Sequence, residues 1–98
     1  MNEKLQRLAK LREMLLRMEG ELGLGELSRF ERDLLYAVRD LAGEGQIVRS
    51  ADLRSHSLTV RMAQPTFHRA LRELIARGYL RHAEDARTRY YVVSTPDP

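Results

Sequence analysis

The chain has 98 residues, of which 43% are hydrophobic and 32% charged, and its net charge is +3. This length predicts one globular domain with a modest core and no deep catalytic cleft, and the composition argues against disorder. The absence of cysteine excludes disulfides and thiolate metal sites, and no apolar run is long enough to cross a bilayer. We therefore expect a cytoplasmic protein that does not associate with membranes.

Residues 1–22 are predicted to form an amphipathic N-terminal helix. Apolar residues recur at intervals of three and four, which defines the seam of a coiled coil. The seam residues are Leu8, Leu11, Leu15, Met18 and Leu22. Three glycines, Gly20, Gly23 and Gly25, are expected to break the helix. Because an isolated helix of this length is marginal in water, its apolar face must pack on something. We favour a homodimer, and packing against the same chain remains the alternative.

A second helix is predicted to begin at a capping box, in which Ser28 and Glu31 cap each other's backbone N–H groups. Gly43 and Gly45 are expected to end it. The apolar side of this helix is predicted to consist of Phe30, Leu34, Leu35, Val38 and Leu41.

Shorter segments follow the second helix. Residues 46–48 are β-prone, and another helix begins at Ser50 with Leu53 as its clearest core position. Residues 56–62 fit a strand, a continuation of that helix or an irregular turn equally well.

The clearest helical pattern of the C-terminal half covers about residues 63–77. Pro65 fits only in a first helical turn, and Gly78 is typical of a helix end. Its apolar face consists of Phe67, Ala70, Leu71, Leu74 and Ile75. Residues 79–81 and 89–93 then predict two strands of a hairpin. The expected fold class is therefore mainly α with a small β-hairpin.

The segment from Met62 to Leu80 resembles the recognition-helix segment of MarR-like winged helix-turn-helix transcriptional regulators. Arg69, Leu74 and Gly78 stand at the intervals found in that group. The following residues 85–87, an acid, an alanine and an arginine, resemble its wing tip. The resemblance covers about residues 28–94. It implies a winged helix-turn-helix DNA-binding domain at 26–94, preceded by the amphipathic helix at 1–22.

The chain departs from the MarR-like pattern in three ways. Ala63 occupies the helix cap where serine is usual, and the turn before Met62 is longer. The C-terminal dimerisation helices of typical members are absent, so only the N-terminal helix can take that role.

Positive charge gathers in the region of this resemblance. Residues 61–91 contain seven arginines and three carboxylates. A helix fits the major groove, where arginine can bond guanine O6 and N7, and a basic hairpin can follow phosphates or enter the minor groove. The alternative is that these arginines belong to an ordinary solvent-exposed helix face that does not contact DNA. The predicted DNA-binding residues are Gln64, Thr66, His68, Arg69, Arg72, Arg87 and Arg89, with Arg49, Arg54 and Arg61 as weaker candidates.

The predicted function is a sequence-specific regulator that binds double-stranded DNA as a homodimer. The alternative is a winged-helix protein-interaction module without direct DNA binding. We expect no enzyme and no cofactor, because no nucleophile, base and orienting group can be assembled. His56, His68 and His82 are not spaced as metal ligands and are expected on the surface. A small-molecule effector stays an open alternative, with a pocket between the N-terminal helix and the winged domain as its place.

Overall fold

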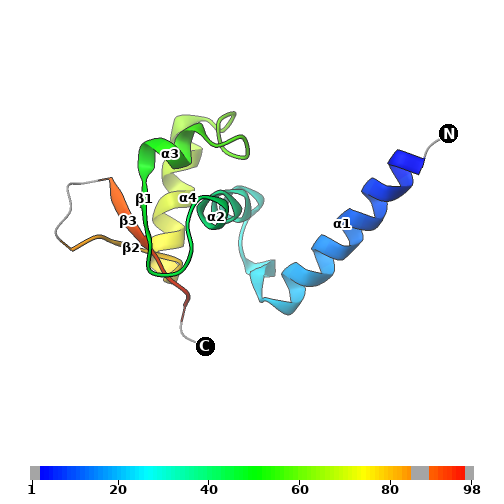
Figure 1. The fold of residues 1–98 in the computed structure, drawn as a ribbon, viewed down its shortest axis with the longest axis horizontal. Helices are drawn as coiled ribbons and strands as arrows, with labels where there is room; N and C mark the ends of the chain where they lie inside the picture. The colour runs from blue at the N-terminus through cyan, green and yellow to red at the C-terminus, as the bar shows by residue number, and fades with distance from the viewer. Residues whose placement is uncertain (1–2, 85–88, 97–98) are drawn as a thin grey trace.

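A computed structural model describes residues 3–84 and 89–96. This described part is mainly helical, with a small antiparallel sheet (Figure 1). Its elements are α1 (Glu3–Glu21), η1 (Leu24–Glu26), α2 (Arg29–Leu41), β1 (Ile47–Arg49), α3 (Ser50–Ser55), α4 (Gln64–Arg77), β2 (Leu80–His82) and β3 (Tyr90–Val93). The mainly helical class and the order of the helices agree with the sequence patterns.

The sheet has three strands, formed by the predicted hairpin and by the β-prone run that precedes α3. Its order is β1-β3-β2, and both pairings are antiparallel. Val48 of β1 lies opposite Tyr91, and Leu80 of β2 lies opposite Val93. The β-prone run at residues 46–48 is thus a strand, shifted by one residue. Its pairing with β3 joins segments more than forty residues apart, which no local pattern reveals.

The core lies between α2, α4 and the sheet, with α3 closing one end. The largest fully buried side chains come from all of these elements and include Leu34, Leu53, Phe67, Leu74, Leu80 and Val93. Two residues of the predicted apolar side of α2 lie outside the core: Phe30 is 43% exposed and Leu41 is 46% exposed. Both occupy the end turns of α2, beyond the elements that cover its middle, and Ala37 is buried instead.

The predicted capping box at the start of α2 is confirmed. The Glu31 backbone N–H donates to the Ser28 hydroxyl at 3.1 Å, and the Ser28 backbone N–H donates to the Glu31 carboxylate at 2.9 Å. These bonds satisfy two of the N–H groups that any helix start leaves without helical partners. The start of α2 is therefore fixed by local sequence.

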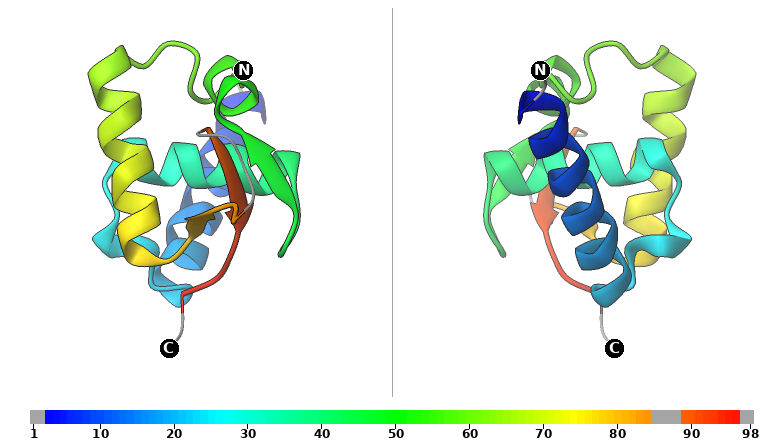
Figure 2. Two further views of the ribbon diagram at one scale, coloured as in Figure 1. Left: turned by 90° about the vertical axis from the view of Figure 1, so that its left-hand side faces the viewer. Right: turned by 90° about the vertical axis from the view of Figure 1, so that its right-hand side faces the viewer.

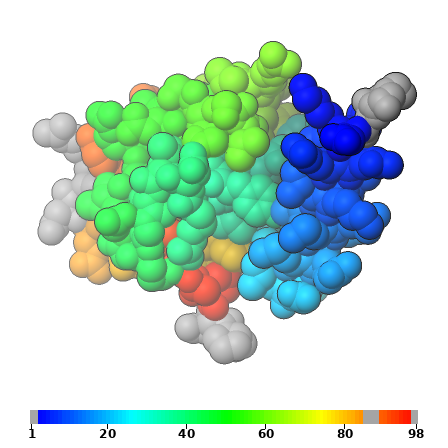
Figure 3. Space-filling model, turned by 45° about the vertical axis from the view of Figure 1, so that its right-hand side comes forward, coloured from blue at the N-terminus to red at the C-terminus, as the bar shows by residue number. Residues whose placement is uncertain are grey.

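In Figure 1, helix α1 extends to the right, away from the other elements. In the space-filling view of Figure 3, it lies at the edge of the molecule beside α2. Contrary to expectation, Gly20 lies inside α1, and the chain turns at Gly23, whose φ is +73°. The five seam residues are between 40% and 70% exposed, so their own chain leaves much of the seam uncovered, although Leu15 and Leu22 line hollows beside α2.

Two polar contacts of Glu19 hold the C-terminal end of α1 to α2. Glu19 is buried on α1, where its carboxylate accepts from the Tyr36 hydroxyl and lies 3.6 Å from Arg32 Nε. Arg32 also donates to the carbonyl of Leu27 at 2.7 Å, which fixes the connection between the two helices. Within residues 3–84 and 89–96, no helix is long and apolar enough to cross a membrane.

Candidate nucleic-acid interface

Helix α4 packs one side into the core and leaves the other in solvent. Phe67, Ala70, Leu71 and Leu74 are buried. At its end, Gly78 has φ +90° and donates to the carbonyl of Ile75 at 3.1 Å, which turns the chain into β2. In the left view of Figure 2, α4 and the sheet face the viewer and α1 lies behind them. One side of the molecule therefore presents both α4 and the hairpin.

The outward face of α4, defined here as His68, Arg69 and Arg72, carries positive charge without an acid. All three side chains are exposed. Among the described residues, none of the ion pairs involves Arg69 or Arg72. The acid of α4, Glu73, lies 3.5 Å from Arg77 on the flank of the helix. The guanidinium groups of the outward face are thus available to an anionic partner.

The first turn of α4 contains two further residues that are predicted to bind DNA, and they lie on different sides of the helix. Gln64 is exposed, and its amide nitrogen lies 3.2 Å from His68 Nε2. Thr66 is half-buried, and its hydroxyl lies 3.5 Å from Arg69 Nη2. Thr66 and Arg69 line a shallow hollow beside Ser28 at the start of α2. Gln64 and Thr66 therefore do not point to the same place.

Arg54 fixes the turn that precedes α4, a role that sequence analysis missed. Its guanidinium donates to the carbonyls of Thr59 and Met62, at 2.7 and 2.5 Å, and to Gln64 Oε1 at 3.1 Å. It also lies 5.2 Å from the ring centre of Phe67. Residues 56–63 are an irregular turn, so the strand and longer-helix alternatives are wrong. Arg54 is therefore committed within the chain rather than free to contact a phosphate.

His56 also holds the turn at residues 56–63, through two contacts of its side chain. Its Nε2 lies 2.8 Å from the Asp40 carboxylate, and its Nδ1 accepts from the backbone N–H of Leu58 at 3.0 Å. The side chain is only 11% exposed, so the prediction of a surface position is wrong. Asp40 belongs to α2 and precedes His56 by 16 residues, so local sequence spacing does not reveal this contact. In the part of the chain that is described, no three histidine or carboxylate side chains group as metal ligands.

Two hairpin arginines, Arg87 and Arg89, are predicted to bind DNA, and the structure describes Arg89. Arg87 lies outside the described residues, as do the other two members of the acid-alanine-arginine motif at 85–87. Arg89 is exposed with φ +91°, and its carbonyl accepts from the backbone N–H of Ser50 at 2.9 Å. Arg49 forms a bidentate pair with Asp52, whose carboxylate raises the pKa of Arg49.

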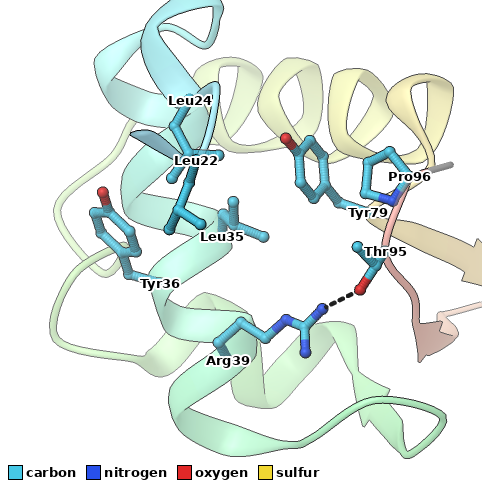
Figure 4. Close-up of a pocket in the computed structure, with 8 residues that line it drawn as sticks. All are labelled: Leu22, Leu24, Leu35, Tyr36, Arg39, Tyr79, Thr95 and Pro96. Atoms are coloured by element: carbon cyan, nitrogen blue, oxygen red, sulfur yellow. Dashed lines mark hydrogen bonds between the residues drawn. The ribbon is translucent and has the colours of Figure 1, made fainter. Parts of the chain in front are cut away.

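An apolar pocket of about 480 Å³ lies at the joint between α1 and α2 (Figure 4). Arg39 at its edge is already engaged, because it donates to Glu44 at 3.0 Å and to the Thr95 hydroxyl at 2.9 Å. Hydrogen bonds from Thr95 and Arg39 hold the pKa of Glu44 below its usual value. Burial and the hydrogen bond to Glu19 raise the pKa of Tyr36 to about 12. The lining residues are Leu22, Leu24, Leu35, Tyr36, Arg39, Tyr79, Thr95 and Pro96.

Comparison with known proteins does not identify the chain. No protein-family model matches it, and neither the curated proteins nor the solved structures contain a match. The MarR-like resemblance of the sequence therefore stays a prediction, and the residues of the outward face and the hairpin are the basis for assigning a function.

Proposed function

We propose that this protein is a winged helix-turn-helix regulator that binds double-stranded DNA and recognises sequence with α4. The observation that carries this proposal is the outward face of α4, where two exposed arginines without acidic partners stand beside a histidine. A helix fits the major groove of B-DNA, and arginine bonds guanine through O6 and N7. In this proposal Arg69 and Arg72 contact base edges, and His68 contributes a further donor or acceptor.

The first turn of α4 suits contact with a phosphate. Ala63 at the cap offers no side-chain oxygen, so it leaves N–H groups of the first turn without a capping bond. Such N–H groups, together with the helix dipole, bind anions. Arg54 holds this turn in place, which fixes the register at which α4 would meet the groove.

The hairpin supplies a second contact in this proposal. Arg81 on β2 and Arg89 before β3 are exposed, and the hairpin lies on the same side of the molecule as α4 (Figure 2). Arginines on a wing contact phosphates or enter a narrow minor groove. These contacts would add affinity and orientation, while α4 would read the sequence.

The regulator is proposed to act as a homodimer through α1 and to catalyse no reaction. A two-fold dimer presents two copies of α4 to half-sites related by the same symmetry. The exposed seam of α1 supports this part of the proposal, because five apolar side chains remain open to a partner.

The test is selection of bound duplexes from random genomic fragments, followed by fluorescence anisotropy with the selected site. We expect inverted repeats and an affinity that falls steeply with salt, because phosphate contacts release counterions. The Arg69→Ala/Arg72→Ala variant should lose about 1–3 kcal/mol of binding free energy for each base-reading arginine.

A matched control removes the same charge far from α4. Lys10→Ala/Arg17→Ala also deletes two cations, from exposed positions on α1, and should retain sequence discrimination. No binding to any duplex at low salt would contradict the proposal. Retained function in Arg69→Ala/Arg72→Ala would favour the protein-interaction module instead.

A further inference from the structure

The seam of α1 is an uncovered apolar surface, with all five side chains at least 40% exposed. The accessible surface of the chain is 7263 Å², whereas a globular monomer of 11.4 kDa exposes about 5,800 Å². This excess of about 1,500 Å² is larger than the roughly 800 Å² that each partner buries in a standard protein interface. The extended position of α1, whose seam side chains are 40% to 70% exposed, accounts for part of this excess.

The charges beside the seam indicate what covers it. Residues seven apart share one side of a coiled-coil helix. One flank of the seam carries Arg7, Met14 and Glu21, with the positive charge near the N-terminus and the negative charge at the C-terminus. The other flank contains Glu19, which is already bonded to Tyr36 and Arg32 of α2. The flank of Arg7 and Glu21 is thus the one left open, and it complements itself when reversed.

Parallel pairing of two α1 helices would oppose like charges. In a parallel coiled coil, the position of Arg7 lies against the position five residues later on the second helix, which is Arg12. Two such contacts, one on each side, would repel. In antiparallel pairing, equivalent flanks meet, so Arg7 approaches Glu21 of the second copy and this attraction occurs twice. On the other flank Arg12 meets Arg12 of the second copy once, so attraction outweighs repulsion.

We propose that α1 pairs with α1 of a second copy as an antiparallel coiled coil, in which Leu8 packs on Met18 of the second copy and Arg7 pairs with its Glu21. The same register places Leu11 on Leu15 of the second copy. It also places Lys4 of the second copy beside Leu22, so the N-terminal turn of that helix covers the edge of the apolar pocket in Figure 4. This arrangement rests on the proposed homodimer and defines its geometry.

Cross-linking without DNA tests the orientation directly. The chain has no cysteine, so single-cysteine variants report only the introduced thiols. Leu8→Cys and Met18→Cys are oxidised separately and as a mixture of two chains of different mass. We expect the mixed disulfide in the mixture and little self-cross-linking of either variant. Efficient self-cross-linking of each variant would show a parallel pair and overturn the proposal.

Charge reversal provides an independent test by sedimentation equilibrium. Arg7→Glu should raise the dimer dissociation constant about tenfold, because two attractive surface pairs become repulsive. The combination Arg7→Glu/Glu21→Arg should restore wild-type dimerisation, and both effects should shrink at high salt. Tighter dimerisation of Arg7→Glu than of the wild type would overturn the proposal. A wild type that is monomeric at all concentrations would also overturn it. Because neither assay contains DNA, its outcome is separate from that of the DNA-binding test.

Discussion

Arg54 shows how one side chain positions a surface that it does not itself form. Its three donors reach two carbonyls of the turn before α4 and the side chain of Gln64. The Thr59 carbonyl also accepts from the backbone N–H of Met62, and a carbonyl of an irregular turn that is withdrawn from water needs a donor. The guanidinium is suited to this role because it presents several donors in a fixed plane.

The Arg54→Lys variant should therefore unfold more easily although its charge is retained. An ammonium group cannot reach three separated acceptors in one plane, and we expect a loss of about 2 kcal/mol in the free energy of unfolding. Urea denaturation followed by circular dichroism measures this. Arg61→Lys is the matched control on an exposed residue of the same turn, and it should change the free energy by less than about 0.5 kcal/mol. Equal stability of the two variants would contradict the role assigned to Arg54.

The raised pKa of Tyr36, at the joint between α1 and α2, predicts that the free energy of unfolding depends on pH. This pKa is about 12 in the folded chain, against an ordinary value of 10.0. As pH rises from about 10 to about 12, the unfolded chain loses this proton first, so the free energy of unfolding falls. Below about pH 10 this contribution is fully present.

The measurement compares wild type with Tyr36→Phe, which lacks the titrating group. The urea midpoint of the wild type should fall more between about pH 9 and about pH 11 than that of the variant. Because the chain has no tryptophan, tyrosinate absorbance follows the titration directly. A difference spectrum that titrates near pH 10 would show that burial and Glu19 do not raise this pKa.

At the scale of the element, α2 and α4 begin in opposite ways. The start of α2 is closed by reciprocal bonds between Ser28 and Glu31, whereas α4 begins at Ala63 with no side-chain cap. A closed start stabilises the helix locally, and an open start keeps N–H groups for another acceptor. This contrast gives the start of α2 a structural role and leaves the start of α4 open for the phosphate contact of the proposed function.

Removing the cap of α2 should destabilise the fold. Ser28→Ala is expected to cost about 1 kcal/mol in the free energy of unfolding, because the Glu31 N–H loses its acceptor. Ser57→Ala, an exposed serine in the turn before α4, is the control and should be nearly neutral. Chemical denaturation of both variants gives the comparison, and equal stability would show that the capping box contributes little.

At the scale of the whole molecule, the shape reflects the uncovered helix. The radius of gyration is 14.7 Å, against about 12.6 Å for a globular domain of this length. The long axis of 54 Å exceeds the next axis of 31 Å because α1 extends away from the core. A helix in that position gains its stability from whatever covers its apolar side.

Thermal stability should consequently depend on protein concentration. Dimerisation of folded chains stabilises the folded state by mass action, so the Tm of the wild type should rise with concentration. Leu11→Lys in the seam should abolish this dependence. Leu16→Lys is the matched control, because Leu16 is similarly exposed on α1 but lies outside the seam, and it should behave like wild type. A wild-type Tm that is constant with concentration would contradict the homodimer.

Patterns within one turn or one helix were sufficient to predict much of this protein. The capping box at Ser28, the end of α4 at Gly78 and the buried face of Phe67, Leu71 and Leu74 depend on neighbours three or four residues away. Such neighbours meet in any chain that forms the helix, so sequence spacing determines them. The outward face of α4 follows from the same periodicity.

Only the tertiary structure decided the contacts between distant segments. The pairing of β1 with β3, the bond between Asp40 and His56 and the contact of Glu19 with Tyr36 join residues whose separation follows no local period. Phe30 and Leu41 belong to the apolar side of α2 by spacing yet are exposed, since the spacing of apolar residues defines a face but not how far along the helix that face is covered. Periodicity thus determined the helices and their faces, and packing between elements decided where α1 and the turn before α4 are held.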